Sequence, residues 1–263
     1  MLRTDLLVIL LTALLAAQTA RGQSVEETES EAVEASSKPN PRSQSVDSLA
    51  AARLIVEKTN DFRVERDRSR VKLSPLLVET ARYFASYMAK NDQYGHRADG
   101  RTPSERAAEF DYDYCLVSEN IAYQYNSSGF ATAELAERFV EVWKTSPRHR
   151  QNMLDDDVVE TGVAVAHSED TGYWYAVQMF GRPMSAAIEF SIANRSDTTV
   201  DYTIRDRTFE LPPGYTRTHV RCRVTKTHFE FLASEGQAGT IQPSNGERLT
   251  IVRRNGTLDV KRQ

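Results

Sequence analysis

The sequence lacks the short motifs that mark several large classes of enzyme. It contains no His-Glu-x-x-His segment of a zinc protease, no Gly-x-Ser-x-Gly turn of a serine hydrolase and no Gly-rich phosphate-binding loop. No residue is therefore assigned a catalytic role from the sequence. Whether the protein is an enzyme stays open at this point.

Long hydrophobic runs are also scarce, and the longest lies near the N-terminus. Leu6–Ala17 is apolar over twelve residues, follows Arg3 and precedes the small residues around Ala20. This pattern is typical of a secretory signal peptide, here residues 1–22. The run is shorter than the about 20 apolar residues of a membrane-spanning helix, although an uncleaved anchor is the alternative. We therefore expect a secreted or periplasmic protein with no transmembrane segment after signal cleavage.

Positive charge is not concentrated in any one stretch of the chain. The formal net charge is −4, and the basic residues of the C-terminal part, 186–263, are scattered along the sequence. Nucleic-acid-binding proteins carry their bases as a patch or stripe, so no nucleic acid partner is expected. The stretch 23–47 is acidic and nearly free of large apolar side chains, which predicts a disordered acidic linker.

Cysteine is limited to Cys115 and Cys222. In an oxidising compartment such a pair is a candidate disulfide, and two buried free thiols are the alternative. The two positions fall in different predicted domains, so a bridge would connect one domain to the other. In the chain-entropy model, closing a loop of this length contributes about 4–5 kcal/mol.

Residues 48–183 show helical spacing first and strand-like alternation afterwards. Apolar residues recur at helical intervals from Leu49 to Phe62, and several polar residues followed by proline mark further helix starts. Strands are expected at 162–166 and 173–180. Helices packed on a sheet within one unit correspond to the α+β class. The expected helices begin near Asp47, Ser74, Thr102, Thr132 and Ser146.

The helical signals stop beyond Pro183. Short alternating stretches, such as 188–192 and 200–204, are separated by turn signals such as Pro212-Pro213-Gly214. Short strands at this spacing predict a small all-β module over residues 186–263, an antiparallel sandwich or barrel.

His96, Glu119 and His149 are the residues best suited to chemistry. Each is expected at a turn or a helix start rather than on an apolar stripe. If Ser146 caps a helix, His149 lies in its first turn, where the helix dipole favours the neutral imidazole. Two neutral imidazoles and a carboxylate suit a zinc ion with an open position, and they suit acid–base chemistry equally. Scattered residues of this kind are also commonly structural, and that alternative stays open.

Six short motifs follow one another across about half of the chain. They are Thr59-Asn60-Asp61-Phe62-Arg63 with Leu73-Ser74-Pro75-Leu76-Leu77, Gly95-His96-Arg97-Ala98-Asp99-Gly100, Ser118-Glu119-Asn120-Ile121-Ala122, the run from Trp143 to Leu154, Val159–Val163 and Tyr173–Gly181. In this order they resemble the CAP superfamily of cysteine-rich secretory, antigen 5 and pathogenesis-related proteins, in its bacterial secreted SCP form.

The resemblance implies an α-β-α sandwich over residues 48–183, with a cleft lined by two histidines and two glutamates. His96, Glu119 and His149 match three of these four positions. The fourth has no clean counterpart, and Glu160 is the candidate, with Glu141 as the alternative. The resemblance also makes His96 and His149 candidate ligands of zinc or another divalent cation, and no other cofactor is expected.

The resemblance defines no reaction, because members of the superfamily share a fold more than an activity. Three functions therefore remain open. The protein is a binding module for an extracellular ligand (a lipid, a peptide or a cell-wall component), a metal-assisted hydrolase or protease acting on extracellular peptide or cell-wall substrates, or a structural and adhesion protein. We favour the binding module, because the predicted cleft has no dedicated nucleophile.

Overall fold

The computed structural model describes residues 45–233 and 239–263. The predicted signal peptide, 1–22, and most of the predicted acidic linker, 23–47, lie outside the described residues. Helix α1 (Ser48–Val64) begins where the sequence predicts a helix start, next to Asp47. Asp47 caps this helix, because its carboxylate accepts hydrogen bonds from the backbone N–H groups of Leu49 and Ala50 at 2.9 Å each.

The first half of the described chain alternates helices with a four-stranded sheet. The sheet has the order β1-β3-β4-β2, in which β1 runs parallel to β3 and the other pairs are antiparallel. Its strands are β1 (Lys72–Leu73), β2 (Tyr114–Gln124), β3 (Glu160–His167) and β4 (Trp174–Pro183). The helices after α1 are α2 (Pro75–Asn91), α3 (Pro103–Glu109), α4 (Thr132–Thr145) and α5 (Pro147–Met153), and a short 3₁₀ turn, Met184–Ala186, follows β4.

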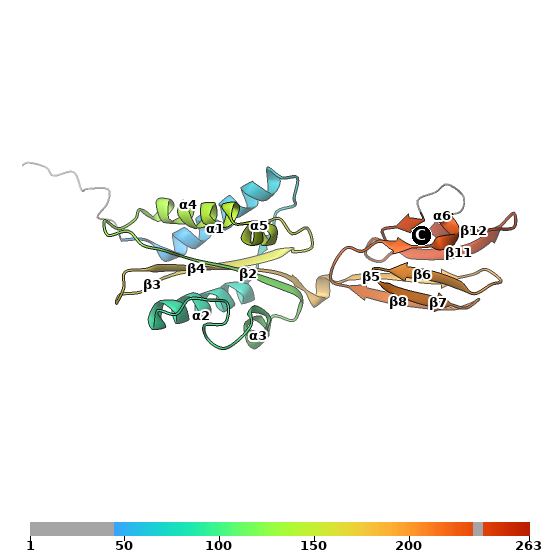
Figure 1. The fold of residues 1–263 in the computed structure, drawn as a ribbon, viewed down its shortest axis with the longest axis horizontal. Helices are drawn as coiled ribbons and strands as arrows, with labels where there is room; N and C mark the ends of the chain where they lie inside the picture. The colour runs from blue at the N-terminus through green and yellow to red at the C-terminus, as the bar shows by residue number, and fades with distance from the viewer. Residues whose placement is uncertain (1–44, 234–238) are drawn as a thin grey trace, which may run out of the picture. The chain divides into compact units, whose positions relative to one another are not determined.

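Helices cover both faces of this sheet (Figure 1). On one face α1 and α4 pack through a core that includes Ile55, Phe139 and Trp143. On the other face α2 and α3 pack through a core that includes Phe84 and Met179. The α-β-α sandwich expected for the helical domain is therefore confirmed.

The C-terminal part is built from strands in two four-stranded sheets. Their orders are β10-β9-β6-β7 and β12-β11-β5-β8, and the apolar side chains of both sheets form one core. The elements are β5 (Ile188–Asn194), β6 (Val200–Ile204), β7 (Arg207–Leu211), β8 (Thr216–Arg221), β9 (Thr227–His228), α6 (Glu230–Ala233), β10 (Thr240–Ile241), β11 (Arg248–Arg254) and β12 (Thr257–Arg262). The predicted all-β region is confirmed.

Two details of this region differ from the expectation. The sandwich is not wholly antiparallel, because β11 pairs with β5 in parallel. A parallel pair needs no tight turn between its strands, so turn signals in the sequence do not reveal it. The region also contains a helical turn, α6, although an all-β module is expected there.

Cys115 and Cys222, for which the sequence leaves a bridge and two free thiols open, are joined in a disulfide. The link connects β2 of the helical domain to the segment that follows β8. Beside it, Arg223 forms ion pairs with Asp155 at 2.7 Å and Asp157 at 3.2 Å. No helix within the described ranges is long and apolar enough to cross a membrane.

A buried histidine connects the two sheets of the β region and makes its stability depend on pH. His219 of β8 is 5% exposed, and its Nε2 lies 2.8 Å from the hydroxyl of Tyr202 on β6. Burial, followed by the charges of Arg221, Arg217 and Arg207, lowers the pKa of His219 from 6.5 to about 4.

Acid should therefore destabilise the β region through His219. The folded state resists the proton that the unfolded state accepts below about pH 6.5, so this contribution to stability is complete above that pH and is lost as the pH falls towards 4. Between about pH 7 and about pH 5 we expect the free energy of unfolding to fall by about 2 kcal/mol through this group alone. Chemical denaturation of His219→Gln should lack this part of the pH dependence, and the exposed His228→Gln should retain it.

Candidate functional site

The loop that carries His96 is shaped by two glycines and a helix cap. Gly95 and Gly100 have φ values of 146° and 84°, where residues with a Cβ are disfavoured. Thr102, where a helix start is predicted, caps α3 through a capping box: its hydroxyl accepts from the N–H of Glu105, and the carboxylate of Glu105 accepts from the N–H of Thr102. The predicted helix start is confirmed, and the capping box fixes the end of the loop between α2 and α3.

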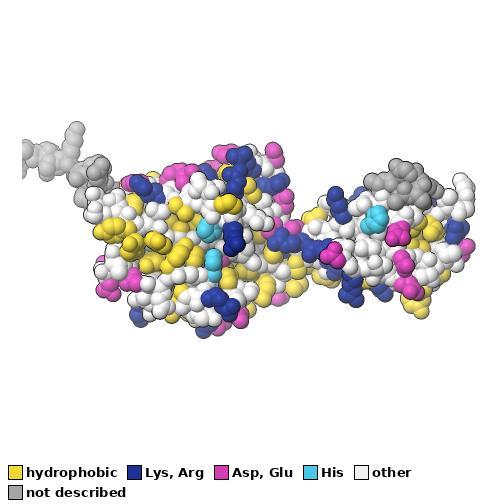
Figure 2. All heavy atoms as spheres, in the orientation of Figure 1, with side chains coloured by type: hydrophobic (Ala, Val, Ile, Leu, Met, Phe, Trp, Pro, Cys, Tyr) yellow, Lys and Arg dark blue, Asp and Glu magenta, His cyan; other side chains and the backbone are white. Residues whose placement is uncertain are grey.

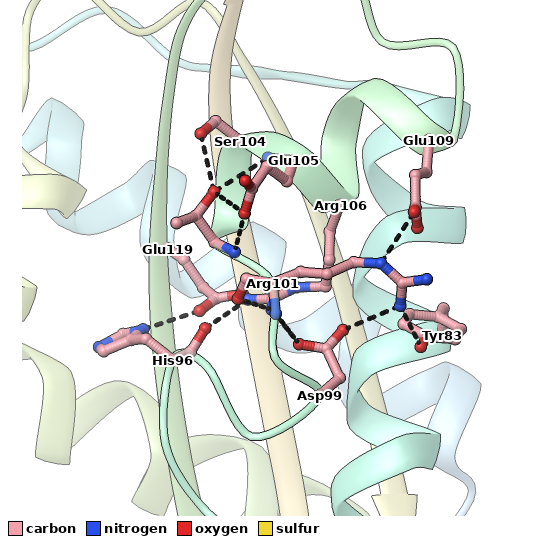
Figure 3. A network of polar contacts seen from close by, with 10 residues as sticks. Tyr83, His96, Asp99, Arg101, Ser104, Glu105, Arg106, Glu109 and Glu119 are labelled. Carbon is pink, nitrogen blue, oxygen red and sulfur yellow. Dashed lines mark hydrogen bonds and ion pairs between the residues drawn. The ribbon is translucent and has the colours of Figure 1, made fainter.

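Arg106 of α3 is the centre of the polar network around this loop (Figure 3). Its side chain is fully buried, and it forms ion pairs with Asp99 at 2.8 Å and with Glu119 at 2.7 Å. The same guanidinium donates to the carbonyl oxygens of Arg101 and His96 and lies 3.4 Å from the ring centroid of Phe84. One cation therefore joins α3, the loop and the central sheet.

Glu119 lies within strand β2, not at a turn as the sequence suggested. Its side chain is completely buried, and both carboxylate oxygens have partners. Oε1 lies 2.7 Å from Nδ1 of His96, and Oε2 accepts from Arg106. The carboxylate is therefore held on one side by a buried cation and on the other by an imidazole that is half-exposed.

His149 occupies the first turn of α5, as predicted. Burial lowers the pKa of His149 below its usual 6.5, and the nearby charge of His96 lowers it further. Both effects favour the neutral imidazole. Nδ1 of His149 is buried and has no hydrogen-bond partner among the described residues. Figure 2 shows histidine side chains at the surface of the helical domain, beside a band of hydrophobic side chains.

Two asparagines hold α5 against β2. Asn120 donates to the carbonyl oxygen of His149 at 3.1 Å, and Asn152 donates to Asn120 Oδ1 at 2.9 Å and to the carbonyl oxygen of Glu119 at 3.2 Å. Asn120 itself lies inside strand β2. Together the asparagines place His149 beside the strand that carries Glu119.

The structure does not bring Glu160 into this cluster. Strand β4 separates β3 from β2, and Glu119 is in register with Met179 and hence with Gly162. Two strand spacings and two residues along the strand separate the two positions, so the Cα atoms of Glu160 and Glu119 lie roughly 12 Å apart on the same face of the sheet. Its carboxylate accepts from the hydroxyl of Tyr112 at 2.9 Å.

The alternative fourth residue, Glu141, lies on the exposed side of α4. Its carboxylate pairs with Lys144 at 2.9 Å, three residues further along the helix. The two residues that do complete the polar cluster, Asp99 and Arg106, were not proposed as site residues from the sequence. Asp99 belongs to the motif around His96, whereas nothing in the sequence distinguishes Arg106 from a solvent-facing arginine.

Comparisons with known proteins agree with this architecture. The family model described as "CAP: Cysteine-rich secretory protein family" matches residues 56–180. Most of the helical domain, residues 48–183, thus lies within the match to the CAP family. No curated protein matches the chain.

Several solved structures are similar to part of this chain at low sequence identity. An outer surface protein of Borrelia burgdorferi is 19% identical, with a TM-score of 0.46, over 53% of this chain and 98% of its own. An extracellular SCP-domain protein of Bacillus anthracis is 21% identical, with a TM-score of 0.44, over 51% of this chain and 41% of its own. A cysteine-rich secretory protein of Staphylococcus aureus is 17% identical, with a TM-score of 0.39, over 52% of this chain and 40% of its own. The chain thus spans less than half the length of the last two.

Proposed function

We propose that the protein is a secreted binding module in which His96 and His149 hold a divalent cation, with zinc as the first candidate, at a site for an extracellular ligand. The contact between Nδ1 of His96 and Glu119 carries this proposal. When Nδ1 donates its proton to the carboxylate, Nε2 keeps its lone pair. In many metal sites of proteins, the ring nitrogen that does not bind the metal donates its proton to a carboxylate, which orients the imidazole.

The residues present fit an open metal site rather than a closed structural one. His149 favours the neutral form that a metal ligand must have, and its unpartnered Nδ1 leaves the imidazole short of one hydrogen bond. Within the described ranges, no group of three or more His, Cys, Asp or Glu residues is arranged to hold a metal. Two histidines would leave the remaining coordination positions to water or ligand atoms, one more than in zinc sites with three protein ligands. A bound cation would supply a positive charge for an anionic group of the ligand.

The state of Glu119 favours binding over hydrolysis. A general base needs a free lone pair directed at the water that it activates. Both oxygens of Glu119 are engaged by Arg106 and His96, and the side chain is fully buried. Glu119 therefore positions His96 and is not suited to take a proton from a substrate water.

Zinc binding to chelator-stripped protein, measured by isothermal titration calorimetry, tests the proposal. We expect His96→Ala and His149→Ala each to weaken the affinity at least about tenfold, since each removes one of two protein ligands. His167→Ala is the matched control, because His167 pairs with Glu169 on another part of the domain. Equal zinc affinity in all four proteins would exclude the site. Melting temperatures of the variants separate loss of a ligand from loss of folding.

A further inference from the structure

The disulfide between Cys115 and Cys222 lines an open pocket of about 690 Å³. Both cysteines are partly exposed, so the bridge lies at the surface rather than within a core. The pocket is also lined by the end of β6, the turn into β7 and the end of β8. Its volume is in the range of small-molecule sites. A small thiol can therefore reach the disulfide, which is the group in this pocket that reacts with thiols.

The charged residues of this pocket are mostly cations. Among the described residues that line it, the charged ones are Arg205, Asp206, Arg207, Arg221 and Arg223. Two of the four arginines, Arg221 and Arg223, flank Cys222 directly in the sequence. Positive charge exceeds negative charge in the lining, even where the one carboxylate compensates one arginine.

Only one of the four arginines forms an ion pair within the described residues. Arg223 pairs with two aspartates of the helical domain at 2.7 Å and 3.2 Å. The potential of the others reaches a neighbouring group: after burial, the charges of Arg221 and Arg207 are among the causes that lower the pKa of His219. The positive charge of the pocket is therefore only partly compensated.

A positive environment makes a disulfide more reactive in two ways. It attracts anionic thiols, and it stabilises the thiolate that leaves when the bond breaks. Because Arg221 and Arg223 flank Cys222, the sulfur of Cys222 is the better leaving group of the two. An attacking thiol is then expected to form its bond with the sulfur of Cys115.

We propose that Cys115 is a site of S-thiolation by a low-molecular-weight thiol whose carboxylates are bound by the arginines of the pocket. The incoming thiolate attacks Sγ of Cys115 and forms a new S–S bond. The bond to Cys222 breaks, and its electron pair leaves with Sγ of Cys222 as a thiolate. This exchange uses one thiol and needs no other oxidant or reductant.

Carboxylates on the thiol are inferred from the arginines, because a planar guanidinium presents paired N–H donors that match a carboxylate. The product has a mixed disulfide on β2 and a free thiolate beside Arg221 and Arg223. The covalent link between the helical domain and the β region is then open. This modification site is separate from the histidine site and does not depend on it.

Reaction of the full chain with reduced glutathione, stopped by alkylation and followed by mass spectrometry, tests the proposal. At matched thiolate concentration and low salt, we expect glutathione to open the bridge about tenfold faster than cysteamine, whose amino group is positively charged. This difference should shrink as the salt concentration rises. Peptide mapping should find glutathione on Cys115 and the alkyl group on Cys222.

Two arginine variants test the role of the pocket. Arg205→Gln and Arg207→Gln should each slow the reaction with glutathione about threefold and leave the reaction with neutral 2-mercaptoethanol unchanged. The control is Arg254→Gln with Lys261→Gln, which removes two positive charges on β11 and β12 and should react as the wild type does. A substitution that only loosened the fold would accelerate every thiol, so the neutral thiol distinguishes the two effects.

Four outcomes would overturn the proposal. They are equal rates with glutathione and cysteamine, opening of the bridge only after the chain is unfolded, glutathione attached to Cys222 instead of Cys115, and equal slowing in the control variant.

Discussion

Replacing Arg106 by methionine is expected to destabilise the helical domain by about 3–5 kcal/mol. The substitution keeps most of the side-chain volume but removes the cation that pairs with two buried carboxylates, Asp99 and Glu119, of which Asp99 keeps Arg101 at 3.7 Å. The side chains of Asp99 and Glu119 are 1% and 0% exposed, so neither can recover its solvation without local unfolding. Removing one partner of a buried ion pair leaves an uncompensated charge, which accounts for an effect of this size. Chemical denaturation monitored by circular dichroism measures it.

Removing the carboxylates together with the arginine provides the control. In a triple variant, Arg106→Met with Asp99→Asn and Glu119→Gln, no buried charge is left without a partner. We expect this variant to regain a large part of the stability lost in Arg106→Met, because a neutral core of similar volume is often as stable as a buried ion pair. If Arg106→Met alone lost less than about 1 kcal/mol, the ion pairs would not hold this loop and strand together.

The start of helix α3 beside this site could be predicted from the sequence, but the buried arginine at the centre of the polar network, Arg106, could not. The proline that follows Thr102 and the glutamate three residues after it determine a local structure, so the start of α3 could be predicted. The burial of Arg106 depends on partners seven and thirteen positions away, Asp99 and Glu119, that meet it only in the folded chain. On a seven-residue helix, an arginine beside two alanines gives no periodic signal of which face is buried.

The position of Glu119 shows a second limit. Three successive polar residues, Ser118, Glu119 and Asn120, interrupt the alternation that identifies a half-buried strand, so a turn was expected there. In the structure β2 is covered on both sides. Glu119 accepts from Arg106 of α3 and Asn120 accepts from Asn152 of α5, whereas the buried hydroxyl of Ser118 has no partner among the described residues. A strand buried on both faces by hydrogen-bonded polar groups lacks the pattern on which strand prediction depends.

The failure of Glu160 to join the cluster has a topological cause. Position in a motif gives distance along the chain, whereas distance across a sheet depends on strand order. Because β4 is inserted between β3 and β2, residues that open β3 are kept two strands away from Glu119. Strand order within a sheet cannot be read from one sequence. The same reason explains why the parallel pairing of β11 with β5 was missed.

Replacing Gly162 by alanine is expected to lower the free energy of unfolding by about 3–4 kcal/mol. Gly162 lies on β3 where α2 crosses the sheet. A Cβ at this position would stand 2.2 Å from the carbonyl carbon of Leu77 and 2.3 Å from the backbone nitrogen of Val78. Backbone atoms of a packed helix cannot rotate away, so α2 would have to move off the sheet as a whole. Thermal and chemical denaturation of the single variant would measure the loss.

Gly181→Ala provides the matched comparison, because Gly181 also lies on a central strand but faces a side chain. There a Cβ would stand 2.4 Å from the hydroxyl oxygen of Tyr112, at the far end of a ring that can shift. We expect a loss of about 1–2 kcal/mol, only a small part of which Tyr112→Phe should relieve in the double variant, because Cε1 and Cζ of the ring would still stand 2.7 Å and 2.8 Å from the Cβ. If both glycine variants lost the same stability, the close approach of the α2 backbone would not be the reason for glycine at position 162. The larger loss at Gly162 would show that helix and strand are held in backbone contact, which fixes α2 and the His96 loop that follows it.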